Sequence, residues 1–197
     1  MAVTMEQIKE LRAQTGAGVL DVKKALEQAD GDMERAAEIL REKGLLAAAK
    51  KADRQAAEGR VEVYVHPGNK LVGIVILNCE TDFVARTEAF IELAHDLAMQ
   101  VAALAPRWVS REDVPADVIA AEKATFADDI AGKPANIAER IVQGKLDKFY
   151  QQYCLLDQAF IKDDSKTVQS LIQEAIARIG ENILVSRIER LSIDSAA

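Results

Sequence analysis

The residues whose side chains could carry out chemistry are few and lie far apart in the sequence. Cys79 and His95 could act as nucleophile and base only if the fold brought them together, and a cysteine at the end of an apolar strand is more often a packed core residue. Neither His95 nor His66 has a neighbour at metal-ligand spacing. Asp163-Asp164 resembles a metal-binding pair, but such acidic runs are usually solvated turns. The sequence therefore predicts no catalytic site and no metal site.

Nucleotide chemistry and disulfide formation are equally poorly supported. Gly16-Ala17-Gly18 follows a predicted helix instead of a strand, and no Lys-Ser/Thr pair comes after it, so it is not a phosphate-binding loop. Cys154 lies between apolar neighbours and is interpreted as a core residue. Two unpatterned cysteines make no disulfide framework, which favours a reducing cytoplasm.

Length and composition limit the class of protein further. The chain has 197 residues and a net charge of −7, which fits one or two soluble domains and argues against a protein that follows nucleic-acid phosphates. No stretch reaches the roughly 18–20 apolar residues of a membrane span, and residues 1–6 lack the features of a secretory signal. We therefore expect a cytoplasmic protein with no direct nucleic-acid partner and no membrane partner.

The elements that would position any site begin with three short helices in residues 1–44. Thr4 and Gln7 have the form of a capping box, Asp32 can cap the third helix, and Gly44 is placed to end it. Each helix carries an apolar stripe. The stripes consist of Met5, Ile8 and Leu11 in the first helix, Val19, Val22, Leu26 and Ala29 in the second, and Met33, Ala36, Ala37 and Leu40, which are expected to face inward, in the third.

Residues 45–58 form the predicted link to the next domain. The alanines favour a helix, and four basic residues give the segment around it a locally positive surface. No wide apolar face is present, so the segment is either a helical connector or a merely solvated linker. The basic residues are Lys50, Lys51, Arg54 and Arg60.

From residue 59 onward the pattern predicts an α+β core. Alternating apolar residues predict a β-hairpin of strands 61–65 and 71–77, and a third strand is expected near 182–188. Helices are expected near 87–105, 115–130, 134–151 and 166–179. We expect a three-stranded antiparallel sheet with helices on one face. The second strand is apolar on both faces, so the other face needs a second copy of the chain or another domain.

The segment from Asn78 to Arg86 is the most informative for function. It joins the central strand to the next helix, for which Thr87 can serve as N-cap, and such a junction is a rigid mount for an exposed loop. Phe83 follows Asp82 and therefore puts an apolar ring beside a carboxylate. Two interpretations stay open: the ring folds inward as a core aromatic, or it is exposed and contacts a partner.

Two motifs carry a resemblance to a known family. Thr81-Asp82-Phe83-Val84-Ala85, preceded by Asn78-Cys79, closely resembles the hallmark of the translation elongation factor Ts family. Leu11-Arg12 and the run from Thr15 to Leu26 resemble that family too. The length resembles its short members, which have a single core module. Further matching segments are Lys50-Lys51-Ala52, Glu58-Gly59, Gly132-Lys133-Pro134, Leu155–Gln158 and Phe160–Asp163.

The resemblance implies a guanine-nucleotide exchange factor for elongation factor Tu. Such a factor binds the GDP-bound and nucleotide-free forms of its partner, without covalent catalysis and without a cofactor. The resemblance also implies a three-helix domain of the ubiquitin-associated type at residues 1–44, a connector at 45–58, a core and dimerisation domain at 59–197, and a homodimer. The positions that match the family's partner contacts are Val19, Leu20, Lys23 and Lys24 in the helical domain, and Thr81, Asp82, Phe83 and Val84 near the partner's Mg²⁺.

Two other classes of protein compete with this interpretation. A dimeric interaction module would tether partners without releasing nucleotide, and the residues alone do not separate it from an exchange factor. A cysteine-dependent enzyme using Cys79 would be sensitive to thiol alkylation.

Overall fold

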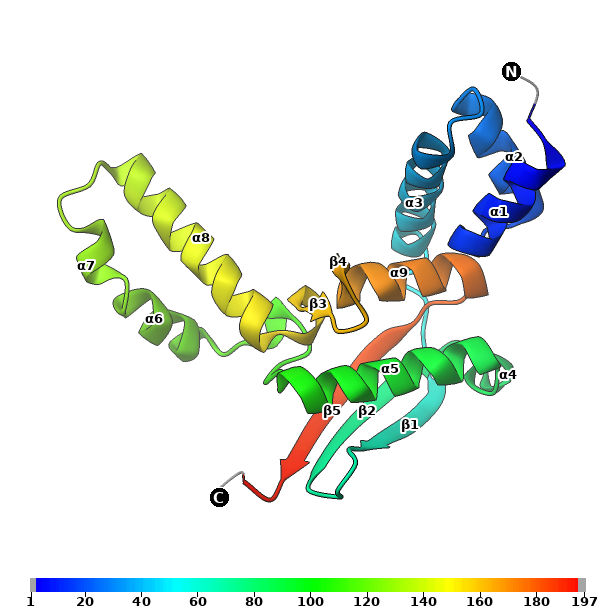
Figure 1. Cartoon of the computed structure of the whole chain (residues 1–197). Helices are drawn as coiled ribbons and strands as arrows, with labels where there is room; N and C mark the ends of the chain where they lie inside the picture. Colours follow the sequence, from blue (N-terminus) through cyan, green and yellow to red (C-terminus); the bar gives the residue numbers. More distant parts are fainter. Residues whose placement is uncertain (1–2, 195–197) are drawn as a thin grey trace. The chain divides into compact units, whose positions relative to one another are not determined.

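The structure is a computed structural model that describes residues 3–194 (Figure 1). The chain forms two compact units. The first combines the segment up to Gly59 with Asn78–Leu93 and Ser170–Leu184, and the second combines Arg60–Leu77, Ala94–Gln169 and the segment from Val185 onward. The elements are α1 (Met5–Thr15), α2 (Val19–Gln28), α3 (Met33–Ala49), β1 (Glu58–Val65), β2 (Leu71–Cys79), α4 (Asp82–Ala85), α5 (Glu88–Leu104), η1 (Arg111–Asp113), α6 (Ala116–Ala124), α7 (Ala127–Ile130), α8 (Ala135–Tyr153), η2 (Leu155–Asp157), β3 (Ala159–Phe160), β4 (Asp163–Thr167), α9 (Val168–Ile179) and β5 (Leu184–Ser192).

The three N-terminal helices form a bundle, as the sequence predicts. The capping box is present: the backbone N of Gln7 donates to Thr4 Oγ1 over 3.2 Å, and the backbone N of Thr4 donates to Gln7 Oε1 over 3.0 Å. Gly16 ends α1 with φ +66°, a left-handed conformation that favours glycine. The buried cluster consists of Ile8, Leu11, Val22, Ala25, Leu26, Ala29, Ala36 and Leu40.

The predicted end of the third helix at Gly44 is wrong. Helix α3 continues to Ala49, because residues 45–49 are all strong helix formers and no residue there supplies a left-handed turn. Gly44 has a packing role instead, since a Cβ at this position would lie 3.2 Å from the Cβ of Ala177. The connector expected to be helical over 45–58 is helical only to Ala49, and the chain then turns before β1.

The predicted hairpin and the third strand form an antiparallel sheet with the strand order β1-β2-β5. Gly68 (φ +94°) and Asn69 (φ +57°) make the turn between β1 and β2. Helix α5 covers one face, and Gly73 of β2 lets it approach closely: a Cβ there would lie 2.1 Å from the backbone O of Ala98. The fold class is α+β, with helix on one face of the sheet.

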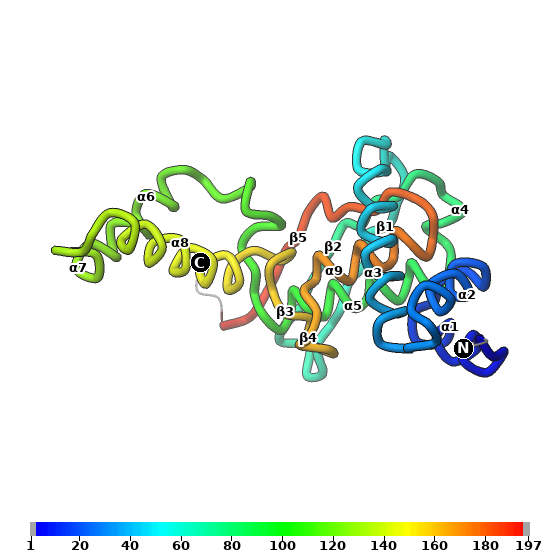
Figure 2. The backbone as a smooth tube through the Cα atoms, turned by 90° about the horizontal axis from the view of Figure 1, so that it is seen from above, coloured from blue at the N-terminus to red at the C-terminus, as the bar shows by residue number. Residues whose placement is uncertain are grey.

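Two features of the second unit differ from the sequence pattern. The helix expected over 115–130 is two helices, α6 and α7, and together with α8 they make a hairpin that runs out and back (Figure 2). The short β3–β4 pair was not predicted, because β3 has two residues and β4 is mostly polar, so neither shows a period-two apolar pattern. At the base of the hairpin Val114, Phe149 and Cys154 make a small core of their own. In residues 3–194 no helix combines the length and the apolar character that a membrane span needs.

Candidate protein-binding site

The Phe83 side chain is exposed, so the interpretation that the ring folds inward as a core aromatic is wrong, while its contact with a partner stays a prediction. It is 80% exposed, more than any other large hydrophobic side chain in the described residues. It belongs to α4, a single helical turn directly after β2, while Ala85 on the same turn is buried. The expected junction of strand and helix is therefore present, with the aromatic ring on the outside.

Side-chain caps at both ends hold this turn. The backbone N of Val84 donates to the Thr81 hydroxyl over 3.4 Å, so Thr81 is the N-cap of α4. The Thr87 hydroxyl donates to the backbone O of Val84 over 2.8 Å. Thr87 Oγ1 also accepts from the backbone N of Phe90 over 3.4 Å, which makes it the N-cap expected for α5.

Asp82, beside Phe83, is partly exposed and paired. Its Oδ2 accepts a hydrogen bond of 2.8 Å from Arg86 Nη2, one turn further along. Because both side chains face solvent, this pair contributes little to stability.

The loop before Phe83 is tied to a segment that the sequence analysis did not single out. The Glu181 carboxylate accepts hydrogen bonds from residues 80 and 81, and the backbone N of Asn182 donates to Glu80 Oε1 over 2.7 Å. Asn182 is buried, and its Nδ2 donates to the backbone O of Arg54 over 2.8 Å. A Glu-Asn pair placed between a glycine and an apolar strand is a pattern that could have pointed to these contacts.

The helical-domain positions also lie on the surface. Val19 and Leu20 are 46% and 72% exposed at the start of α2. Lys23 and Lys24 are exposed on the same helix, and Lys23 Nζ lies 3.7 Å from Glu27 Oε1. An exposed apolar pair thus lies on the same helix as two exposed cations, and its contact with a partner stays a prediction.

The residues considered for catalysis have other roles. Cys79 is buried and its Sγ donates to the backbone O of Thr81 over 3.1 Å, while His95 Nδ1 lies 3.2 Å from Glu62 Oε1 and its ring packs edge-on against Tyr64. Asp163 is exposed and bonds Ser165. Within residues 3–194 no group of three potential metal ligands comes together.

Burial makes both thiols poor nucleophiles. Desolvation raises the pKa of Cys79, and the nearby Glu181 carboxylate raises it further. Desolvation, with a smaller contribution from Asp157, raises the pKa of Cys154 to about 11. A thiol rather than a thiolate is therefore present at neutral pH, which is the unreactive form.

An exposed aromatic residue on a braced loop and a separate exposed apolar pair define a candidate protein-binding site on an α+β protein. Comparison with known proteins agrees with this class. The family model described as Elongation factor TS matches residues 2–176. An Elongation factor Ts from Herpetosiphon aurantiacus is 55% identical over 197 residues, covering 99% of this chain and all of the relative. Those from Fervidobacterium nodosum (53% identical, 98% and 99% covered) and Thermotoga maritima (55%, 98% and 97%) are similar over nearly their whole length. The chain belongs to the elongation factor Ts family.

Proposed function

We propose that this protein is a guanine-nucleotide exchange factor for elongation factor Tu and binds its GDP-bound and nucleotide-free forms. The observation that carries the proposal is the Phe83 ring, which is 80% exposed on a loop that is hydrogen-bonded to Glu181 and to Asn182. A large apolar side chain held in water is costly for an isolated protein, and burial in a partner recovers that free energy.

The proposed action is a disturbance of the partner's Mg²⁺ site. Mg²⁺ requires near-ideal octahedral oxygen coordination at about 2.0–2.1 Å, so small shifts of the loops around it weaken its binding sharply. Phe83 enters the partner as a wedge, and Thr81, Asp82 and Val84 accompany it. Once Mg²⁺ is lost, the charge of the GDP diphosphate is less well neutralised, and GDP leaves faster.

This mechanism needs no bond to be made or broken. Exchange factor and GDP each weaken the binding of the other by the same factor, because the linkage between two sites is reciprocal. A catalytic triad, a metal of its own and a cofactor are therefore unnecessary for this protein. The proposed place of action is the cytoplasm, with no direct contact to nucleic acid or membrane.

A second contact is proposed for the helical domain. We divide the chain into a helical domain at 1–44 of the ubiquitin-associated type, a connector at 45–58 and a core at 59–197. Val19 and Leu20 would dock on the nucleotide-binding domain of the partner, with Lys23 and Lys24 at the rim. The exposure of both apolar side chains supports this role.

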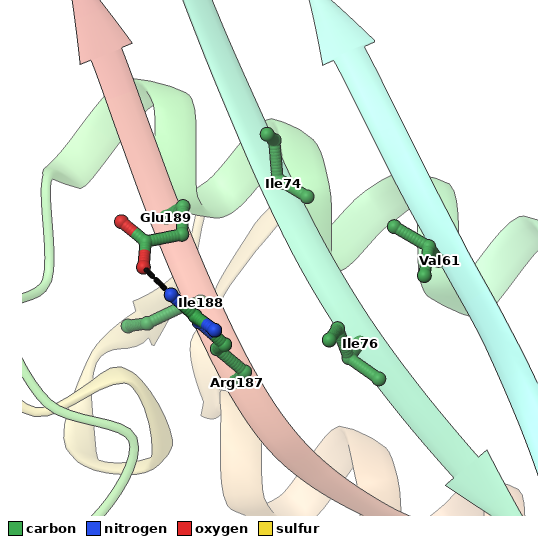
Figure 3. Close-up of a pocket in the computed structure, with 6 residues that line it drawn as sticks. All are labelled: Val61, Ile74, Ile76, Arg187, Ile188 and Glu189. Carbon is green, nitrogen blue, oxygen red and sulfur yellow. Dashed lines mark hydrogen bonds and ion pairs between the residues drawn. The ribbon is translucent and has the colours of Figure 1, made fainter.

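A homodimer is proposed for the core. The face of the sheet opposite α5 carries Val61, which is exposed, and Ile74 and Ile76, which are half-buried (Figure 3). Val63 and Val65 of β1 are also about half exposed. The family resemblance implies a homodimer, and a second copy of this chain could cover this surface, because the two-fold symmetry of a homodimer lets one apolar face cover its equivalent.

Measuring the release of labelled GDP from elongation factor Tu tests the proposed function. Wild-type protein is expected to accelerate release, and Phe83→Ala to lose about 30-fold or more of that acceleration, because truncating an interface anchor costs about 2 kcal/mol or more. The fold of this variant is expected to survive, since Phe83 contributes little to the core.

Leu104→Ala is the matched control, because Leu104 is another exposed apolar residue, 45% exposed, outside the proposed contacts. If Phe83→Ala releases GDP as fast as wild type, the wedge mechanism is wrong. If the wild type binds elongation factor Tu and leaves GDP release unchanged, the protein is instead an interaction module.

A further inference from the structure

We propose that Glu181 is a positioning residue for nucleotide exchange: its carboxylate fixes the backbone from which Phe83 projects. The inference rests on the proposed function and adds a residue that lies far from Phe83 in the sequence. Glu181 follows α9, where Gly180 turns the chain with φ +92°. In this proposal it acts through the loop, to which it is hydrogen-bonded.

The Glu181 carboxylate accepts three hydrogen bonds from the loop. Its Oε2 accepts from the backbone N of Glu80 and from that of Thr81, each over 3.0 Å. Its Oε1 accepts from the Thr81 hydroxyl over 2.7 Å. An ionised carboxylate is an acceptor only, and its hydrogen bonds are shorter and stronger than those between neutral groups. One side chain therefore fixes two consecutive peptide units directly before Phe83.

The Thr81 hydroxyl connects Glu181 to the helical turn α4. It has a single hydrogen, which it donates to Glu181, so a lone pair faces the backbone N of Val84. Without Glu181 the hydroxyl is free to rotate, and the N-cap of α4 loses its fixed orientation. The path from Glu181 to the turn that holds Phe83 thus passes through one side chain.

The loop also accepts a hydrogen bond from the segment that contains Glu181. Glu80 Oε1 accepts from the backbone N of Asn182 over 2.7 Å, and Arg54 Nη1 lies 3.4 Å from that oxygen. On the other side of the loop, Cys79 Sγ donates to the backbone O of Thr81. The loop is therefore braced in the free protein, and a preorganised loop does not lose conformational freedom when it binds.

Alanine and glutamine variants of Glu181 separate positioning from general stability. Glu181→Ala is expected to speed amide hydrogen exchange at Glu80 and Thr81 at least tenfold and to leave the amides of α2 unchanged. At a saturating concentration of Glu181→Ala, GDP release from elongation factor Tu is expected to be about tenfold slower than with the wild-type protein. Glu181→Gln keeps an oxygen acceptor for the two backbone amides and should retain most of the rate. Glu38→Gln, an exposed carboxylate on α3, is the control and should behave as wild type.

A double variant provides the decisive comparison. If Glu181 acts through Phe83, adding Glu181→Ala to Phe83→Ala lowers GDP release no further. Additive losses, or unchanged amide exchange at residues 80 and 81 in Glu181→Ala, overturn the proposal. If Glu181→Ala unfolds, amide hydrogen exchange of Glu181→Gln is measured instead. We expect its amides to be as protected as those of the wild type. Loss of protection throughout the chain would indicate that Glu181 has a purely structural role. If wild-type protein fails to release GDP, the proposed function is wrong, while the amide exchange still tests the brace.

Discussion

Cys79 and Cys154 are the residues whose chemistry most resembles catalysis, and their surroundings suppress it. Both side chains are fully buried, and burial raises the pKa of each thiol. Cys79 serves instead as a donor to the loop that carries Phe83. The role of a residue therefore follows from its position more than from its type. Cys79 bonds the loop of the candidate site, and Phe83, the most exposed large apolar residue among residues 3–194, is the proposed contact.

We expect neither thiol to react with a thiol reagent in the native protein at pH 8, and both to react after unfolding. The fold favours the neutral thiol of Cys154, so its contribution to stability is complete below the unfolded pKa of about 9. That contribution is lost as the pH rises through the folded value of about 11. Thiol titration with and without denaturant measures the reactivity, and the unfolding midpoint between pH 8 and 11 measures the stability.

Rapid modification of Cys79 in the folded protein, accompanied by turnover of a small substrate, would support the cysteine-dependent enzyme. Phe83→Ala is the control for this measurement, because its thiols should be as protected as those of the wild type.

Helix α5 approaches strand β2 closely at Gly73. Gly73 has no side chain, and a Cβ there would lie 2.1 Å from the backbone O of Ala98 and 2.7 Å from the backbone N of Ala102. These are backbone atoms within a helix, so neither can move aside as a flexible side chain does. Helix α5, which follows the Phe83 loop, therefore packs directly against β2.

Gly73→Ala is therefore expected to destabilise the protein by about 3 kcal/mol or more, toward the upper end for overpacked cores. Urea unfolding followed by circular dichroism measures the loss. Gly144→Ala is the matched control, because no atom lies within 4 Å of a Cβ at this helical position. Its stability should rise by up to about 1 kcal/mol, since alanine favours a helix. Equal stabilities for the two variants would contradict the close packing of α5 on β2.

The whole molecule presents one surface that a single copy leaves open. In the second unit, α5 covers one face of the sheet, while Val61, Val63 and Val65 of β1 are 60%, 47% and 49% exposed. The ion pair of Arg187 and Glu189, 2.8 Å apart, lies on β5, and Ile74 and Ile76 of β2 lie between this pair and Val61 of β1 (Figure 3). An apolar strip with a polar border is typical of an interface between subunits.

Val63→Glu is expected to convert the proposed homodimer into a monomer at micromolar concentration, because it places a carboxylate in the centre of an apolar interface. Sedimentation equilibrium measures the mass. Leu46→Glu, at a side chain that is 64% exposed on α3, should remain dimeric. A wild-type monomer under these conditions refutes the homodimer and leaves the exchange experiment unaffected.

Local patterns were enough to determine most of the elements and the position of the candidate site. The capping box at Thr4, the hairpin with its turn at residues 66–70, and the loop at residues 78–86 depend on neighbours in sequence, so short-range physics fixes them. The predicted helix end at Gly44 is wrong, because a glycine without a positive φ does not end a helix that strong helix formers continue.

Contacts between residues far apart in the sequence decided how the loop before Phe83 is held, and no local pattern contains this information. The hydrogen bonds from residues 80 and 81 to Glu181, which we propose to hold the turn that carries Phe83, span about a hundred residues of sequence. The sequence alone predicted which residues this protein offers to a partner. Only the tertiary structure decided how they are held, because the energy that fixes a loop comes from whichever distant segment the fold brings beside it.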